Sequence, residues 1–182
     1  MMNQCRARAA CIFMMAALLS AGPASAEIST EIENVACTEE SSAAERQPVI
    51  VCVLDSGCNW DGVQGLSLVT EKDDLTDETG HGTEMMDLIQ EAAPDAKLYM
   101  IKCFEKEMCT PEVLADAVYA AVDKYHADII SMSWTGTREN KELYQAIQYA
   151  AEEGCVLIAS AGNLSLTQPL GSIVYPAGWV TT

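Results

Sequence analysis

The sequence predicts an α/β fold with three layers (αβα), in which helices cover both faces of a mostly parallel β-sheet. Two observations support this prediction. Short apolar runs rich in β-branched residues recur along the chain, and such runs are typical of strands buried on both faces of a parallel sheet. Between them lie segments with the apolar spacing of amphipathic helices, and this alternation of strands with helices favours a parallel sheet.

Four apolar runs are the predicted strands. The first, VIVCVL at 49–54, is followed by the turn sequence Asp-Ser-Gly. Three later runs, at 97–103, 128–133 and 155–160, have the same form. Each run is too short for a buried helix and suits a strand that crosses the middle of a sheet.

Helices are predicted between these strands. Thr110 can cap a helix in which Pro111 takes the first position, because proline lacks the N–H that would be unpaired there anyway. A second helix is predicted over roughly 139–153, with Gly154 as its C-terminal stop. A further helix is expected to begin at His81.

The N-terminal residues differ from the rest of the chain. In 1–26, two arginines precede a short apolar run and an Ala-x-Ala sequence, which is the pattern of a secretory signal peptide. A membrane anchor is the alternative, but the run is shorter than the ~20 residues needed to span a bilayer. Residues 27–47 are polar and acidic and predict a flexible leader before a domain at 48–182. We therefore expect a secreted or periplasmic protein with no membrane association after cleavage.

The chain is strongly acidic. Its formal net charge is −17, and loss of the two arginines in 1–26 leaves 8 basic and 27 acidic residues. Such a surface repels nucleic acid and anionic membranes, so neither is expected as a partner. The acidic run at 71–78 lacks the Asp-x-Asp-x-Asp-Gly spacing of a calcium loop, which favours a solvated loop. No metal or cofactor is predicted, and structural calcium remains an unsupported alternative.

Six cysteines follow residue 26. An even number in an exported chain favours disulfides, of which six cysteines allow fifteen pairings. Cys103 and Cys109 flank a short loop and are the favoured pair. A zinc site is disfavoured because no two cysteines have CxxC spacing. The six are Cys37, Cys52, Cys58, Cys103, Cys109 and Cys155.

Three polar residues coincide with predicted element ends at the carboxyl edge of the sheet, where open parallel sheets place their chemistry. Asp55 ends the first strand, His81 begins a helix between two glycines, and Asn163 follows the last strand. An acid can orient an imidazole, the imidazole can accept a proton from a nucleophile, and an amide can donate to an oxyanion. His126, the other histidine, is expected to have a structural role.

These motifs resemble those of the subtilisin-like serine peptidases (subtilases). VIVCVLDSGCN is similar to the family's aspartate motif, GHGTEM to its histidine motif, and ASAGN to its oxyanion motif. SMSWTG is similar to its substrate-binding strand, which implies substrate contacts for Ser133, Trp134 and Thr135, although Thr135 stands where glycine is usual. The resemblance implies a serine endopeptidase with Asp55, His81 and Asn163 as catalytic residues and a peptide or protein substrate.

The nucleophilic serine of the family lies in a Gly-Thr-Ser motif on a later helix, and no such tripeptide occurs here. Ser160 and Ser172 lack that context and are assigned to structure. We therefore expect a C-terminally truncated peptidase domain that is inactive as this chain alone. The alternatives are an exported pseudoprotease that binds peptide or protein, and one half of a split peptidase completed by a C-terminal segment.

Overall fold

The computed structural model describes residues 47–106, 108–162 and 174–180. Five parallel strands form one sheet in the order β2-β3-β1-β4-β5. Their bounds are Ile50–Asp55 (β1), Gly65–Ser67 (β2), Lys97–Lys102 (β3), Ile129–Met132 (β4) and Val156–Ala159 (β5). The predicted runs are therefore four of the five strands, and all pairings are parallel as expected.

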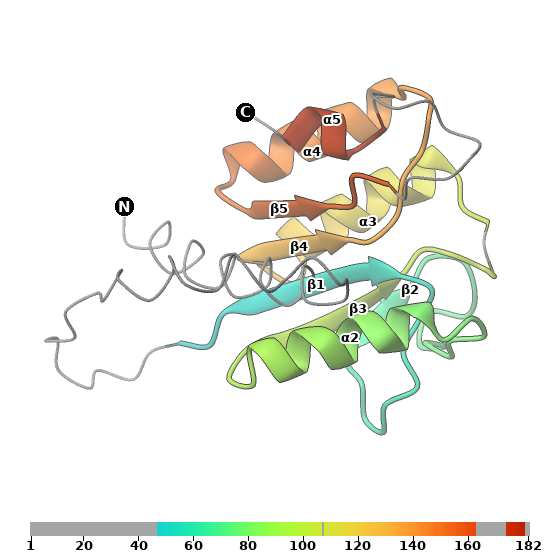
Figure 1. The fold of residues 1–182 in the computed structure, drawn as a ribbon, viewed down its shortest axis with the longest axis vertical. Coiled ribbons are helices and arrows are strands. Elements are labelled where there is room, and N and C mark those ends of the chain that lie inside the picture. The colour runs from blue at the N-terminus through green and yellow to red at the C-terminus, as the bar shows by residue number, and fades with distance from the viewer. Residues whose placement is uncertain (1–46, 107, 163–173, 181–182) are drawn as a thin grey trace, which may run out of the picture.

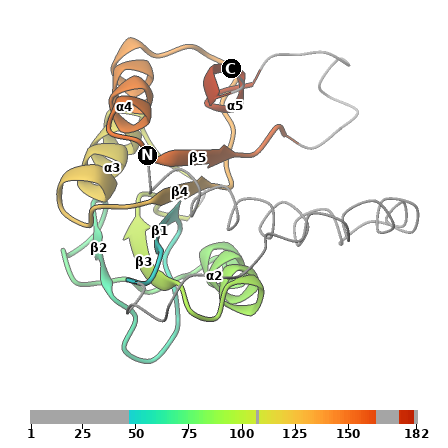
Figure 2. The same ribbon diagram turned by 90° about the vertical axis from the view of Figure 1, so that its left-hand side faces the viewer.

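Helices lie on both faces of the sheet. Helix α2 (His81–Ala92) packs on one face, and α3 (Pro111–Asp123) and α4 (Lys141–Glu152) pack together on the other (Figures 1 and 2). A one-turn helix, α5 (Ala177–Val180), lies near β5 and α4. The three-layer αβα prediction is confirmed.

Each face of the sheet has its own apolar core. On the side of α3 and α4, alternate residues of the central strands, such as Cys52, Leu54 and Ile130, pack against the helices. On the other side, Val53 and Met100 pack against the α2 residue Met86. Because neighbouring residues of a strand point to opposite faces, a continuous apolar run supplies both cores.

The helix starts follow from capping. Thr110 caps α3 through its hydroxyl, which accepts a hydrogen bond from Val113 N–H (3.4 Å). Asn140 caps α4 by accepting from Leu143 N–H (2.9 Å), so this helix begins at residue 141 rather than at 139. The short strand β2 was not predicted. It begins at Gly65, whose missing side chain lets it lie directly against the Met100 backbone.

Candidate active site

Asp55 and His81 are in direct contact at the carboxyl end of β1. The imidazole Nδ1 of His81 lies 2.8 Å from Oδ1 of Asp55. Asp55 is 3 % exposed, whereas the His81 side chain is 48 % exposed and faces solvent. A carboxylate only accepts hydrogen bonds, so this contact places the Nδ1 proton of a neutral His81 toward Asp55 and leaves Nε2 as an acceptor. The predicted juxtaposition is confirmed, and the catalytic role of the pair remains a proposal.

Glycine occupies the two positions beside His81 for different structural reasons. Gly80, the N-cap of α2, has φ +81°, a left-handed conformation that suits glycine, and it has open space around it. Gly82 is a case of close approach. A Cβ there would lie within 3.0 Å of the Gly57 carbonyl oxygen and 3.1 Å from the Asp55 Cβ. The absence of a side chain at Gly82 thus allows the first turn of α2 to lie against the end of β1.

Asp77 organises the N-terminus of α2, which the sequence did not reveal. The acidic run at 71–78 was expected to be solvated, but Asp77 is only 5 % exposed. Its Oδ2 accepts hydrogen bonds from Thr83 N–H (2.9 Å) and Thr83 Oγ1 (2.8 Å), and its Oδ1 accepts from Gly80 N–H (3.0 Å) and Ser56 Oγ (2.9 Å). Burial alone would raise its pKa, but these hydrogen bonds outweigh burial and lower the pKa of Asp77 to about 2. The prediction of a solvated loop is therefore wrong at this residue.

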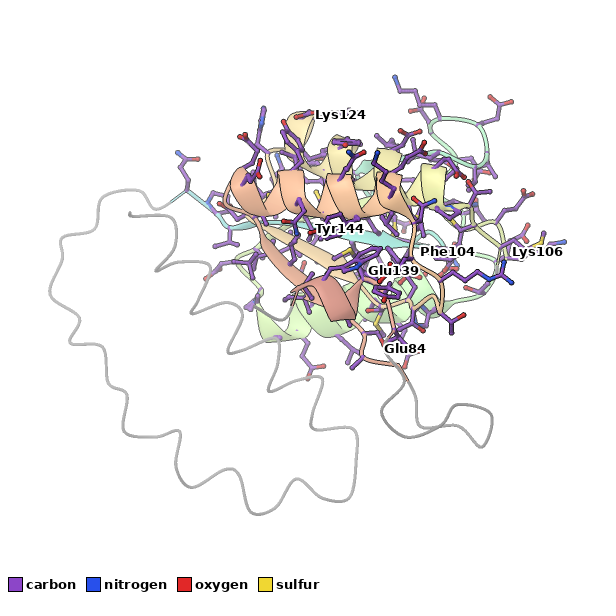
Figure 3. The ribbon with its side chains drawn as sticks, turned by 90° about the horizontal axis from the view of Figure 1, so that it is seen from above. Glu84, Phe104, Lys106, Lys124, Glu139 and Tyr144 are labelled. Atoms are coloured by element: carbon purple, nitrogen blue, oxygen red, sulfur yellow. The ribbon has the colours of Figure 1, made fainter. Side chains whose placement is uncertain are left out.

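A hollow of about 380 Å³ adjoins the His81–Asp55 pair, and Ser133 and Trp134 line it as well. The indole N–H of Trp134 donates to the Leu54 carbonyl (3.1 Å), which fixes the ring against the end of β1. Phe104 packs against Trp134 with a centroid distance of 6.2 Å. Phe104 and Lys106, which also line the hollow, lie toward the end of the sheet to which the strands point (Figure 3).

Trp134 and Phe104 also line a second hollow, of about 340 Å³. Thr135 lines this second hollow and not the first. Ser133 and Trp134 therefore line the same hollow as Asp55 and His81, whereas Thr135 lines the neighbouring one. Substrate contacts for these three residues stay a prediction. Asn163 and Ser172 lie outside the described residues.

The described cysteines are free thiols. Cys52, Cys58, Cys103, Cys109 and Cys155 form no disulfide with one another, which differs from the expectation for Cys103 and Cys109. Cys103 is fully buried, and burial, followed by a hydrogen bond with the neighbouring Cys109 thiol, raises its pKa. The two thiols therefore lie near each other in the reduced state. Cys37 is outside the described residues.

Within 47–106, 108–162 and 174–180, no group of three or more His, Cys, Asp or Glu side chains could hold a metal ion. In the same ranges, no helix has the length and apolar character needed to cross a membrane.

Comparisons with known proteins agree with this geometry. The chain is 27 % identical over 144 residues to the minor extracellular protease Epr of Bacillus subtilis (strain 168), covering 71 % of this chain and 22 % of that protein. It is 27 % identical over 158 residues to an intracellular serine protease of Paenibacillus polymyxa, covering 75 % of this chain and 48 % of that protein. The chain thus spans less than half the length of either relative.

A solved structure shows the same fold. The crystal structure of a lanthipeptide protease superposes with a TM-score of 0.57 at 24 % identity, covering 63 % of this chain and 39 % of that one. The profile of the subtilase family matches residues 46–181, which is most of the sequence. With its parallel sheet and the Asp55–His81 contact at the sheet's carboxyl edge, the chain belongs to the subtilase family.

Proposed function

We propose that this chain supplies the acid and base of a serine endopeptidase site. One observation carries the proposal: the 2.8 Å contact between His81 Nδ1 and the buried Asp55 carboxylate, at the rim of a hollow large enough for a peptide side chain. In this role, Asp55 holds the imidazole in the Nδ1–H tautomer. His81 Nε2 then accepts the proton of a serine hydroxyl and later delivers it to the leaving amine.

The remaining predicted residues have roles around this pair. Asn163 is proposed to donate its side-chain amide to the oxyanion that forms when the peptide carbonyl is attacked. Ser133, Trp134 and Thr135 are proposed to bind the peptide or protein substrate, and two of them line the hollow at His81. Trp134 lines both this hollow and the neighbouring one, which supports binding of an extended chain with a side chain in each space.

The nucleophile is the part of the site that these residues do not supply. Ser56 is buried, and its hydroxyl is engaged with Asp77 and Gly82. Ser160 accepts a hydrogen bond from Gly162 N–H (3.2 Å), which fits a turn after β5 rather than a catalytic role. In a subtilisin, loss of the serine alone lowers kcat by roughly 2 × 10⁶. We therefore propose that these 182 residues hydrolyse no peptide unless a serine-bearing segment completes the site.

The names of the relatives do not decide the localisation, because one is an extracellular protease and another an intracellular one. Secretion is therefore proposed on the pattern of residues 1–26 alone. Export would expose the cysteines to an oxidising environment, in which Cys103 and Cys109 are the proposed disulfide. The influence of Cys109 on the pKa of Cys103 indicates that the two side chains are neighbours, which supports this pairing.

The test compares two polypeptides. One is the 182-residue chain, and the other is the same chain joined to a Gly-Thr-Ser-x-Ala segment encoded by the DNA that follows, if such a reading frame is present. We expect the joined polypeptide to hydrolyse a fluorogenic peptide and to react with a fluorophosphonate, while the 182-residue chain does neither. Asp55→Asn and His81→Ala should each lower kcat of the joined polypeptide by about 10⁴ or more. His126→Gln, which changes the other histidine, is the matched control.

Other outcomes would point elsewhere. Fluorophosphonate labelling of the 182-residue chain, mapped to Ser160 or Ser172, would show that one of these serines is the nucleophile. If no serine-bearing frame follows and the chain binds peptides without cleaving them, the pseudoprotease alternative holds. Activity that appears only when a separate serine-bearing chain is added would establish a split peptidase.

A further inference from the structure

We propose that Asp77 is the positioning residue that holds His81 in contact with Asp55. This inference rests on the proposed function, because it concerns how the acid–base pair is assembled. Asp77 touches neither ring nor carboxylate of the pair in any hydrogen bond that the described residues form. It acts through the backbone and hydroxyl groups on both sides of the pair.

The first connection is to the helix that carries His81. The four N–H groups at the start of an α-helix have no partner within the helix. In α2 the N-cap is Gly80, which has no side chain to supply one. The Asp77 carboxylate takes its place and accepts from the first and last of the four, Gly80 N–H (3.0 Å) and Thr83 N–H (2.9 Å). Asp77 therefore fixes the backbone on either side of His81.

The two inner N–H groups are held by hydroxyls that Asp77 itself orients. His81 N–H donates to Thr79 Oγ1 (3.2 Å), and Gly82 N–H donates to Ser56 Oγ (3.1 Å). Both hydroxyl oxygens lie within hydrogen-bond distance of Asp77 Oδ1, at 3.0 Å for Thr79 and 2.9 Å for Ser56. Each of the four free N–H groups of the first turn of α2 is thus hydrogen-bonded to Asp77, either directly or through one hydroxyl.

The second connection is to the strand that carries Asp55. Ser56 follows Asp55 directly, and its own N–H donates to Asp55 Oδ1 (2.8 Å), the same oxygen that His81 contacts. Because the Ser56 hydroxyl also contacts Asp77, this one carboxylate ties the end of β1 to the start of α2. Asp77 therefore determines the distance between His81 and Asp55.

The chemistry of the site requires a carboxylate rather than an amide. Backbone N–H donors reach both oxygens of Asp77, Thr83 on one side and Gly80 on the other. An asparagine has nearly the same shape, but its NH₂ group would have to face one of these donors. A donor facing a donor forms no hydrogen bond, and a buried polar group without a partner is costly. In either orientation of the amide, Asp77→Asn should therefore lose the hydrogen bond on one side of His81, from Gly80 N–H or from Thr83 N–H.

The role differs from ordinary capping, for which α3 and α4 provide a comparison. Thr110 and Asn140 each bind one N–H from the N-cap position itself, and no residue of a candidate site lies in those first turns. Asp77 lies three residues before its N-cap and engages α2 and β1 together. Loss of a simple cap would lower only the stability of the protein, whereas loss of Asp77 should also change the tautomer of the His81 imidazole.

The experiment reads that ring directly. The full chain contains only two histidines, so a long-range ¹H–¹⁵N NMR spectrum of ¹⁵N-labelled protein shows two imidazoles, and His126→Gln assigns them. We expect wild-type His81, when neutral, to be predominantly the Nδ1–H tautomer. In Asp77→Asn that preference should be lost, and His81 should approach the tautomer mixture of the exposed His126. Asp74→Asn is the matched control, because Asp74 accepts from Thr76 N–H in the same loop and its hydrogen bond does not involve α2.

A milder pair of variants covers the case in which Asp77→Asn does not fold. Thr83→Val removes the hydroxyl that donates to Asp77 and accepts from Asn59 N–H, and it should reduce the Nδ1–H preference, whereas Thr83→Ser should restore it. If folded Asp77→Asn, or folded Thr83→Val in its absence, keeps the wild-type tautomer, the positioning role is wrong and Asp77 is only a cap. If wild-type His81 itself shows no Nδ1–H preference, the proposed acid–base pair fails, which is a different result from the failure of Asp77 to position it.

Discussion

Gly82→Ala is the substitution with the most direct consequence for the Asp55–His81 pair. The added Cβ would lie within 3.0 Å of the Gly57 carbonyl oxygen, a separation that real Cβ atoms essentially never show, and 3.1 Å from the Asp55 Cβ. Its neighbours are a backbone carbonyl and the first carbon of a buried side chain, which cannot rotate away. The first turn of α2 must therefore move away from the end of β1, on the order of 1 Å to reach ordinary contact.

The size of that displacement decides the outcome. The Nδ1–Oδ1 distance is 2.8 Å, and a shift on the order of 1 Å takes it beyond hydrogen-bond range. Overpacking of this kind costs about 1–3 kcal/mol, and the rigid neighbours place Gly82→Ala near the upper figure. Gly80→Ala is the matched control. It has open space, so it should cost only about 1 kcal/mol for the left-handed conformation and keep the His81–Asp55 contact.

Urea unfolding and the His81 tautomer measured by NMR would separate the two variants. We expect Gly82→Ala to lose both about 3 kcal/mol of unfolding free energy and the Nδ1–H preference, while Gly80→Ala loses only about 1 kcal/mol. Equal stabilities, together with an intact His81 tautomer in Gly82→Ala, would refute the claim that the missing side chain at Gly82 sets the approach of α2 to β1.

Three further predictions concern stability. The pKa of Asp77 is lowered from 3.8 to about 2, so the stability that its carboxylate contributes is present above pH 4 and is lost as the pH falls toward 2. In acid unfolding, the wild type should lose at most about 2 kcal/mol of unfolding free energy over this range, and Asp77→Asn should not show this loss. Asn140→Ala should cost about 1 kcal/mol and Thr110→Ala less, because the Asn140 cap bond is shorter (2.9 against 3.4 Å); equal thermal shifts would contradict this order. Trp134→Phe leaves the Leu54 carbonyl without its indole donor and should cost about 1 kcal/mol in urea unfolding, whereas no change would mean that the bond contributes nothing.

The strands and the Asp55–His81 pair could be predicted because their signals are local. A continuous apolar run followed by Asp-Ser-Gly indicates a buried strand and the residue at which it ends. The end of this strand, with Asp55, and the start of the helix with His81 then meet at the carboxyl edge of a parallel sheet. Strand β2 has only three residues and begins with glycine, so it presents no apolar run to recognise. Its position depends on backbone contact with Met100, which is far away in sequence.

Asp77 could not be recognised for a similar reason. It lies among other acids in a polar loop, and in sequence it is indistinguishable from its solvated neighbours. Its burial arises because Ser56, 21 residues earlier, and Thr83, six residues later, meet at one place in the fold. The expected disulfide illustrates the limit of spacing arguments: Cys103 and Cys109 do lie near each other, but spacing alone does not determine whether two thiols are oxidised.

The start of α2 has one more consequence, for ligands. Helix N-termini commonly bind phosphate, sulfate and carboxylate ions through their free N–H groups. In α2, Asp77, Thr79 and Ser56 already occupy those groups, and the Asp77 charge faces the positive end of the helix. An anion from buffer or an anionic inhibitor would find no unpaired donor there. The N-terminus of the helix that carries His81 therefore offers an anion no free N–H group, and the hollow that His81 lines together with Trp134 is the space left for a ligand.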